Sequence, residues 1–161
     1  MVHFNKSKKQ LLVISLIFSA LFFTGCWWQS SQDPELTVIN VLDKDYFDDC
    51  HIKGSVHIFF DDIADSLKTL DKSKQYVLYC SDQACTSSTY NVKMFLDAGF
   101  QNVWDYEDGM SGWYQAGLPY EGPAEKPYLK NESVNFGDET SDSSTITTQD
   151  LFDKMKEFGL L

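Results

Sequence analysis

The chain has 161 residues, of which 43% are hydrophobic, so it is long enough for one small packed domain with appendages. Its formal net charge is −11, and all 13 of its basic residues are lysines. This acidity leaves no basic face to replace the counterions of a nucleic acid, so we expect no nucleic-acid partner. The lack of arginine also excludes a bidentate arginine clamp for an anionic substrate.

The N-terminus has the pattern of a targeting segment. A basic stretch from His3 to Lys9 precedes the apolar run 11–25, which is shorter than the ~20 residues of a spanning helix. The run ends in Phe23-Thr24-Gly25-Cys26, which resembles the lipobox of bacterial lipoproteins and implies acylation of Cys26. We therefore expect residues 1–26 to be a signal peptide. The mature chain would then be lipid-anchored to a bacterial membrane, in the cell envelope and outside the cytoplasm. An ordinary cleaved signal and an uncleaved anchor are the alternatives.

Strand and helix patterns alternate after a short linker, 27–34. Strands are predicted at 36–41, 54–59, 76–79 and 102–106, and helices at 43–49, from 61 or 62 to 70, from 86 to 98, and around Trp113. Strands that alternate with helices predict an α/β fold with a central parallel sheet and helices on both faces. In such sheets the site lies beyond the carboxyl ends of the strands, where Cys80 falls.

The pattern changes beyond residue 122. Residues 123–145 are polar and acidic, which predicts a linker. Residues 146–161 predict an amphipathic helix that is capped at Thr147. Its apolar face carries Leu151, Phe152, Met155 and Phe158. We expect this helix to dock on the domain, since such a stripe is costly to leave in water, and a free tail is the alternative.

The loop after the 76–79 strand carries the predicted chemistry. It opens with Cys80, and Thr86, Ser87 and Ser88 are good caps for the helix that follows. Such a loop directs backbone N–H groups and the positive end of the helix dipole at one spot. A thiol there is shifted toward thiolate, so Cys80 is the predicted nucleophile.

Landmarks along residues 35–122 resemble the rhodanese family. In chain order they are Thr37-Val38-Ile39-Asn40-Val41, His51-Ile52-Lys53-Gly54-Ser55, Tyr79-Cys80 with its six-residue loop to position 85, Ala98-Gly99-Phe100, Asn102-Val103, Asp108-Gly109, Trp113 and Gly117-Leu118-Pro119. The resemblance implies a rhodanese-like domain of three layers, in which Cys80 carries a sulfane sulfur as a persulfide. It also implies a substrate-binding loop made of Ser81, Asp82, Gln83, Ala84 and Thr86.

The chain departs from the family pattern near the predicted site. Asn40-Val41-Leu42 stands where the family usually has Asp-Val-Arg, and Cys85 stands where it often has arginine. Cys85 has three interpretations. It takes sulfur from a Cys80 persulfide and releases it by forming a Cys80–Cys85 disulfide, it forms a regulatory or structural disulfide with Cys80, or it fills space. Cys50 is predicted to be a small buried residue.

The expected function is sulfur transfer from a sulfane sulfur donor, through Cys80, to a thiol acceptor. Without arginine, and with Asp82 in the loop, thiosulfate should be a poor donor, and a persulfide or polysulfide of low charge is expected instead. No metal and no cofactor are expected, and His51 and His57 are interpreted as structural. The alternative is a rhodanese module without turnover, which would act as a binding, scaffold or redox-sensing lipoprotein.

Overall fold

The computed structural model describes residues 35–131 and 144–161. The predicted signal peptide 1–26, with Cys26, and the linker 27–34 lie outside the described residues. Within the part of the chain that is described, no helix is long and apolar enough to cross a bilayer.

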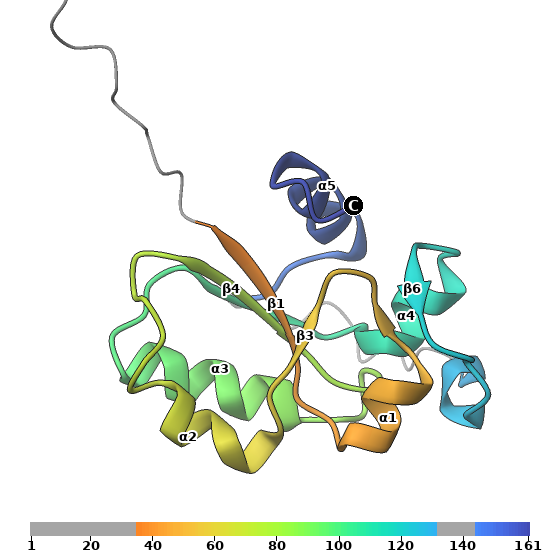
Figure 1. Cartoon of the computed structure of the whole chain (residues 1–161), viewed down its shortest axis with the longest axis horizontal. Coiled ribbons are helices and arrows are strands. Elements are labelled where there is room, and N and C mark those ends of the chain that lie inside the picture. Colours follow the sequence, from red (N-terminus) through yellow and green to blue (C-terminus); the bar gives the residue numbers. More distant parts are fainter. Residues whose placement is uncertain (1–34, 132–143) are drawn as a thin grey trace, which may run out of the picture. The chain divides into compact units, whose positions relative to one another are not determined.

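The core of the domain is a four-stranded parallel sheet. β1 (Leu36–Asn40) lies between β3 (Val56–His57) and β4 (Gln75–Tyr79), and β5 (Val103–Tyr106) lies beside β4 (Figure 1). The predicted α/β fold with a central parallel sheet is therefore confirmed. β3 is shorter than the predicted strand 54–59, because only two of those residues pair with β1.

Both faces of the sheet are covered, because successive residues of each strand enter two different apolar clusters. On β4, Val77 and Tyr79 belong to one cluster, and Tyr76 and Leu78 belong to the other. Cys80 continues this alternation and enters the second cluster, which also contains residues of α3. The pleat of β4 therefore directs the Cys80 side chain toward α3.

Most helices lie where they were predicted. They are α1 (Lys44–Asp49), the 3-10 turn η1 (Phe60–Asp62), α2 (Ile63–Ser66), α3 (Ser87–Asp97) and α4 (Gly109–Gln115). α2 is shorter than the predicted helix to Leu70, because Lys68 and Thr69 bond only three residues back and tighten the chain. Leu70 still packs on the sheet. Trp113 of α4 has no exposed surface, as expected of a core residue.

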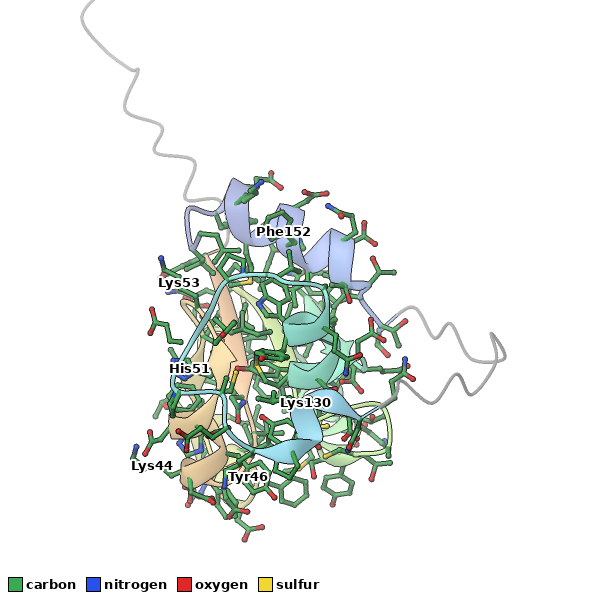
Figure 2. The ribbon with its side chains drawn as sticks, turned by 90° about the vertical axis from the view of Figure 1, so that its right-hand side faces the viewer. Lys44, Tyr46, His51, Lys53, Lys130 and Phe152 are labelled. Atoms are coloured by element: carbon green, nitrogen blue, oxygen red, sulfur yellow. The ribbon has the colours of Figure 1, made fainter. Side chains whose placement is uncertain are left out.

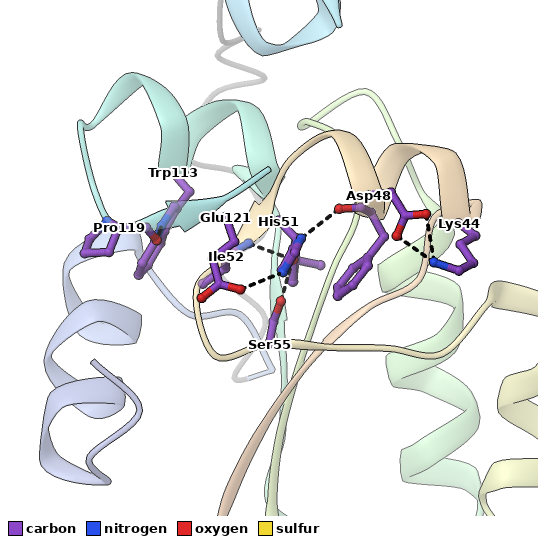
Figure 3. A network of polar contacts seen from close by, with 10 residues as sticks. Lys44, Asp48, His51, Ile52, Ser55, Trp113, Pro119 and Glu121 are labelled. Carbon is purple, nitrogen blue, oxygen red and sulfur yellow. Dashed lines mark hydrogen bonds and ion pairs between the residues drawn. The ribbon is translucent and has the colours of Figure 1, made fainter. Parts of the chain in front are cut away.

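A small antiparallel sheet was absent from the predicted elements. β2 (His51–Ile52) pairs with β6 (Tyr120–Glu121). Both ring nitrogens of His51 are engaged: Nδ1 lies 2.7 Å from the Phe47 carbonyl oxygen, and Nε2 lies 3.5 Å from a Glu121 carboxylate oxygen. Figure 3 shows His51 and Glu121 side by side. His51 therefore has a structural role, in agreement with its interpretation from the sequence.

Part of the predicted linker 123–145 is folded against the domain. The 3-10 turn η2 (Pro127–Lys130) buries Leu129 completely. The Asp49 carboxylate accepts the backbone N–H groups of Glu125 and Lys126 at 3.0 and 3.1 Å. The sequence predicted a linker here because Leu129 is the one fully buried apolar residue in the described part of this polar stretch. The hydrogen-bond acceptor, Asp49, also lies 76 positions before Glu125, so no local pattern indicated the contact.

α5 (Thr148–Glu157) packs on the same apolar cluster as α4. Thr147 caps the helix, as predicted. Leu151 has no exposed surface, and Phe152 (Figure 2) packs edge-on against Trp113, with ring centroids 6.2 Å apart. The helix is therefore docked on the domain, as expected, and is not a free tail.

Leu151→Ala should lower the free energy of unfolding by about 2–5 kcal/mol, because it removes a fully buried side chain of α5. Glu157→Ala, an exposed site on the same helix, is the control and should change stability by less than about 0.5 kcal/mol. Chemical denaturation measures both. Equal stability of the two variants would show that α5 does not contribute to the folded domain in solution.

Candidate active site

The loop from Cys80 to Thr86 joins β4 to α3, and the start of α4 sets its path. The backbone N–H of Met110 donates to the Cys80 carbonyl oxygen at 2.9 Å, and that of Ser111 donates to the Ser81 carbonyl oxygen at 2.8 Å. These two bonds turn the first carbonyl groups of the loop toward α4.

Gly109 makes this close contact possible. Its φ is +60°, and a Cβ atom there would lie 2.8 Å from the Asp82 nitrogen, the Cys80 oxygen and the Ser81 carbonyl carbon. A side chain at this position would therefore collide with backbone and strain the turn. The predicted turn at Asp108-Gly109 does border the loop.

Asp82 closes a turn inside the loop. Its carbonyl oxygen accepts the Cys85 N–H at 3.0 Å, and its Oδ1 accepts the Ala84 N–H at 3.1 Å. Its Oδ2 lies 3.5 Å from the Asn131 side-chain amide, which donates. Asp82 thus shapes the loop and keeps a negative charge there.

Asp108 connects the loop to the C-terminal helix. Its Oδ1 accepts a hydrogen bond from the Gln83 side-chain amide at 2.7 Å, and its Oδ2 accepts one from the Thr148 hydroxyl at 2.7 Å. The Thr148 oxygen also lies 2.8 Å from the Tyr106 hydroxyl. Reasoning from sequence missed Thr148, because 40 positions separate it from Asp108.

Cys80 has no exposed surface, and its sulfur lies between the loop and α3. Its sulfur lies 3.0 Å from the Cys85 carbonyl oxygen and 3.8 Å from the Asp82 carbonyl oxygen, and either can accept the S–H. The Ser88 hydroxyl donates to the Cys80 sulfur at 3.4 Å. The two carbonyl oxygens favour the thiol, whereas Ser88 favours the thiolate.

Cys85 is half-buried, and its side chain interacts directly with that of Cys80. The hydrogen bond from the Cys80 thiol lowers the pKa of Cys85 to about 5, and the backbone N–H groups of Ser87 and Ser81 act in the same direction. The same hydrogen bond, followed by burial, raises the pKa of Cys80 far above that of a free thiol. The two thiols are therefore coupled, so that ionisation of one disfavours ionisation of the other.

This arrangement differs from the expected one. The loop amides were expected to face the Cys80 sulfur, but those of Ser81 and Ser87 face Cys85, and the Ser88 amide faces Cys80. Thr86 holds the N-cap position of α3, but its side chain makes no capping hydrogen bond.

Other candidate residues have structural places. Cys50 is fully buried, as predicted, and burial raises its pKa to about 12. Asn40 Oδ1 accepts the Leu42 backbone N–H at 2.9 Å. In residues 35–131 and 144–161, no group of three or more His, Cys, Asp or Glu side chains is placed to hold a metal ion.

One acid escaped the reasoning from sequence. Asp105 lies in β5 on the side of α3, and its carboxylate is buried. The available signal was an acidic residue within the apolar strand Val103–Tyr106. Such a pattern shows that an acidic residue lies in a buried strand, but it does not show which groups surround the carboxylate.

The family model of the rhodanese-like domain matches residues 27–116, more than half of the chain. The chain therefore belongs to the rhodanese-like domain family.

Two curated relatives are similar to this chain. The protein named "Putative sulfurtransferase YtwF" of Bacillus subtilis (strain 168) is 37% identical over 82 residues, which cover 50% of this chain and 76% of that protein. The "HTH-type transcriptional regulator Rv0324" of Mycobacterium tuberculosis is 33% identical over 85 residues, which cover 53% of this chain but only 37% of the regulator.

Solved structures agree on the fold. The BH2092 protein from Bacillus halodurans has a TM-score of 0.54 and 23% identity, and the match covers 75% of this chain and 80% of that one. The rhodanese-like domain of the Alr3790 protein from Anabaena sp. has a TM-score of 0.50 and 27% identity, with 55% of this chain and 89% of that one covered.

The coupled pair of thiols makes a prediction for thiol alkylation. Cys85 should react with iodoacetamide in mildly acidic buffer, because its pKa is lowered to about 5. Cys80→Ala should move the midpoint of this pH profile up by about one to two units, because it removes the S–H donor. Mass spectrometry after a short pulse locates the label.

Cys50 is the internal reference for this experiment, and it should stay unlabelled at the same pH because burial raises its pKa to about 12. A midpoint for Cys85 in the ordinary thiol range, in the wild-type protein, would contradict the hydrogen-bonded pair.

Proposed function

We propose that this chain is a lipid-anchored sulfurtransferase that carries sulfane sulfur as a persulfide on Cys80 and passes it to a thiol acceptor. The observation that carries the proposal is the pair of interacting thiols, Cys80 and Cys85, in the loop at the carboxyl end of β4. Membership of the rhodanese-like family supports a function of the sulfurtransferase type, and so does the likeness to the Bacillus subtilis protein.

Loading begins with a proton transfer. The Cys80 thiol proton moves along its hydrogen bond to the Cys85 thiolate, which leaves Cys80 as the thiolate. This thiolate attacks the outer sulfur of a donor R–S–SH: an S–S bond forms on Cys80, the S–S bond of the donor breaks, and R–S⁻ leaves as R–SH with the proton of Cys85, which returns Cys85 to the thiolate. Because Cys80 is fully covered in this conformation, the loop has to open to admit the donor.

Two nucleophiles can then discharge the persulfide. An acceptor thiolate R′–S⁻ attacks the outer sulfur, leaves as R′–S–SH and returns the Cys80 thiolate. Alternatively, the Cys85 thiolate attacks the inner sulfur, forms a Cys80–Cys85 disulfide and releases HS⁻. The direct contact of the two side chains favours this second route whenever no acceptor is present.

The charge of the loop favours a donor of low charge. Asp82 stays at the loop as part of its turn, and the sequence contains no arginine to offset a dianion. A persulfide or polysulfide is therefore the proposed donor, and thiosulfate should be a poor one.

Polysulfide should add one sulfur atom to Cys80, measured by intact mass and confirmed by peptide mapping, and thiosulfate should add far less. Cys80→Ser should reduce loading to background. Cys85→Ala should still load, but it should keep the persulfide longer without acceptor because the internal route to HS⁻ is removed. Loading of Cys85 in place of Cys80 would refute the assignment of the carrier.

A redox-sensing module without turnover is the second candidate, and the complete burial of Cys80 favours it. In this case both thiols are oxidised to the Cys80–Cys85 disulfide, and a disulfide partner is reduced to two thiols. Failure of every sulfur donor, together with formation of this disulfide in glutathione disulfide, would favour the sensor over the transferase.

Attachment to a membrane is proposed from the sequence around Cys26. Cells fed labelled palmitate should incorporate the label into the wild-type chain, and Cys26→Ser should lose both the label and the membrane fraction. Cys50→Ala is the control and should keep both. Persistence of the label in Cys26→Ser would contradict the lipid anchor.

A further inference from the structure

A cavity of about 690 Å³ lies between one side of α3 and the end of β5. It is lined, among others, by Thr86, Thr89, Tyr90, Lys93, Asp105 and Glu107. Thr86 is also the last residue of the sulfur loop, so the cavity adjoins that loop. The volume lies within the range of about 300–1,000 Å³ that small-molecule sites occupy.

Asp105 lines this cavity, and the fold gives no structural reason for its buried carboxyl group. Only 2% of it is exposed, and both of its carboxyl oxygens are buried without a hydrogen-bond partner among the residues that the structure describes. Its backbone is satisfied, since its N–H donates to the Ser144 carbonyl oxygen and its carbonyl oxygen accepts the Ile146 N–H. A buried carboxyl group that lacks partners is costly, and native proteins rarely keep one without a use.

The cation that lines the cavity is engaged elsewhere. The Lys93 ammonium group pairs with Asp97 at 2.8 Å. The Ser88 and Thr89 hydroxyl groups of α3 interact with the carboxylate and lower the pKa of Asp105, but neither makes a well-aligned hydrogen bond to it, and the Ser88 hydroxyl donates to the Cys80 sulfur. The described part of the chain therefore leaves the charge of Asp105 without a counterion.

The other ionisable neighbours are acidic. Burial raises the pKa of Asp105, and the negative charge of Cys85 raises it further. Burial also raises the pKa of Glu107, and so do the charges of Asp105 and Asp108. An anionic ligand would be repelled by this group, whereas a cation would be attracted.

We propose that this cavity binds a small organic molecule through a primary ammonium group, which donates hydrogen bonds to the Asp105 carboxylate. An ammonium group supplies three donors on one atom, and the two unpartnered oxygens supply acceptors for them. The carboxyl oxygens are covered in this conformation. The side chains packed around Asp105 therefore have to move apart for the ammonium group to form these hydrogen bonds.

The rim of the cavity defines the rest of the ligand. Tyr90 is 59% exposed and Leu96 is 42% exposed, and both line the cavity. A short apolar body can cover these side chains, and the Tyr90 ring can also lie against the cation. A bare metal ion is a weaker fit, since the described residues offer no cluster of three metal ligands. The ligand class is thus a short aliphatic or aromatic primary amine.

Binding of the amine should depend on pH in a defined direction. The ammonium group pairs with the carboxylate form of Asp105, so affinity should rise as the pH rises through the pKa of Asp105 and fall below it. The groups that face Asp105 are Cys85 from the loop, Glu107 from its own strand end, and Lys93, with Asp97, from α3. Of these, Cys85 and Glu107 also change charge in the acidic range, so the Asp105→Asn variant is needed to assign the pH dependence to Asp105.

The site also has an effect on the loop. The Cys85 charge and the Asp105 charge disfavour each other, and such coupling is reciprocal. A bound ammonium group offsets the charge of Asp105, so it should make the Cys85 thiolate more favourable. Alkylation of Cys85 in mildly acidic buffer should therefore become faster when the amine is bound.

The test uses the full chain and the probe n-butylamine, with n-butanol and butyrate as probes of similar size. NMR chemical-shift titration should show saturable binding of the amine, with shifts centred on residues 89–93 and 105–107. We expect the amine to bind at least about tenfold more tightly than the alcohol, the value of one hydrogen bond to a charged group. Butyrate should not bind.

Asp105→Asn should abolish the preference for the amine, because it removes the charge and keeps the shape. Asp153→Asn changes the net charge equally at an exposed site on α5 and should leave the preference intact. If Asp105→Asn does not fold, loss of amine affinity in the wild-type protein at low pH supplies the same evidence. Equal affinity for amine and alcohol, or an unchanged preference in Asp105→Asn, would overturn the proposal. Neither outcome depends on sulfur transfer.

Discussion

Two hydrogen bonds from the start of α4 to the loop hold the candidate site together. They fix the carbonyl groups of Cys80 and Ser81, and they form because Gly109 lets α4 approach the loop backbone to within a distance that no side chain tolerates. With these carbonyl groups turned toward α4, the rest of the loop can close over the sulfur atoms. The turn at Asp82 and the bridge through Asp108 then stabilise that closure.

Within the closed loop, the chemistry is set by two thiols whose ionisation is coupled. Charge on both sulfurs at once would be repulsive, and burial makes a second thiolate more costly still. Cys80 is fully covered, whereas Cys85 is only half-buried, so burial disfavours a thiolate more strongly on Cys80 than on Cys85.

The acidity of the chain has local consequences. With no arginine in the sequence, negative charge at the loop and beside α3 is not offset by guanidinium groups, and Lys93, which lines the cavity, is paired with Asp97. The lack of arginine argues against an anionic sulfur donor. It also leaves the Asp105 carboxylate without a cationic side chain, so a ligand would have to supply the cation. Sulfur chemistry and amine binding would then occupy neighbouring parts of one acidic surface, joined by Cys85 and Thr86.

The sequence by itself determined the order of strands and helices, the place of Cys80 at the end of β4, the burial of Trp113 and the apolar stripe of α5. These features depend on local periodicity and on glycine and capping residues, which act over a few positions of the chain. Only the tertiary structure decided that the Cys80 side chain is fully covered, that Asp108 bridges Gln83 to Thr148, that Leu129 is buried, and that the Asp105 carboxyl oxygens lack a partner. Each of these depends on contacts between residues far apart in the chain, and no local pattern records which distant groups a fold will bring together.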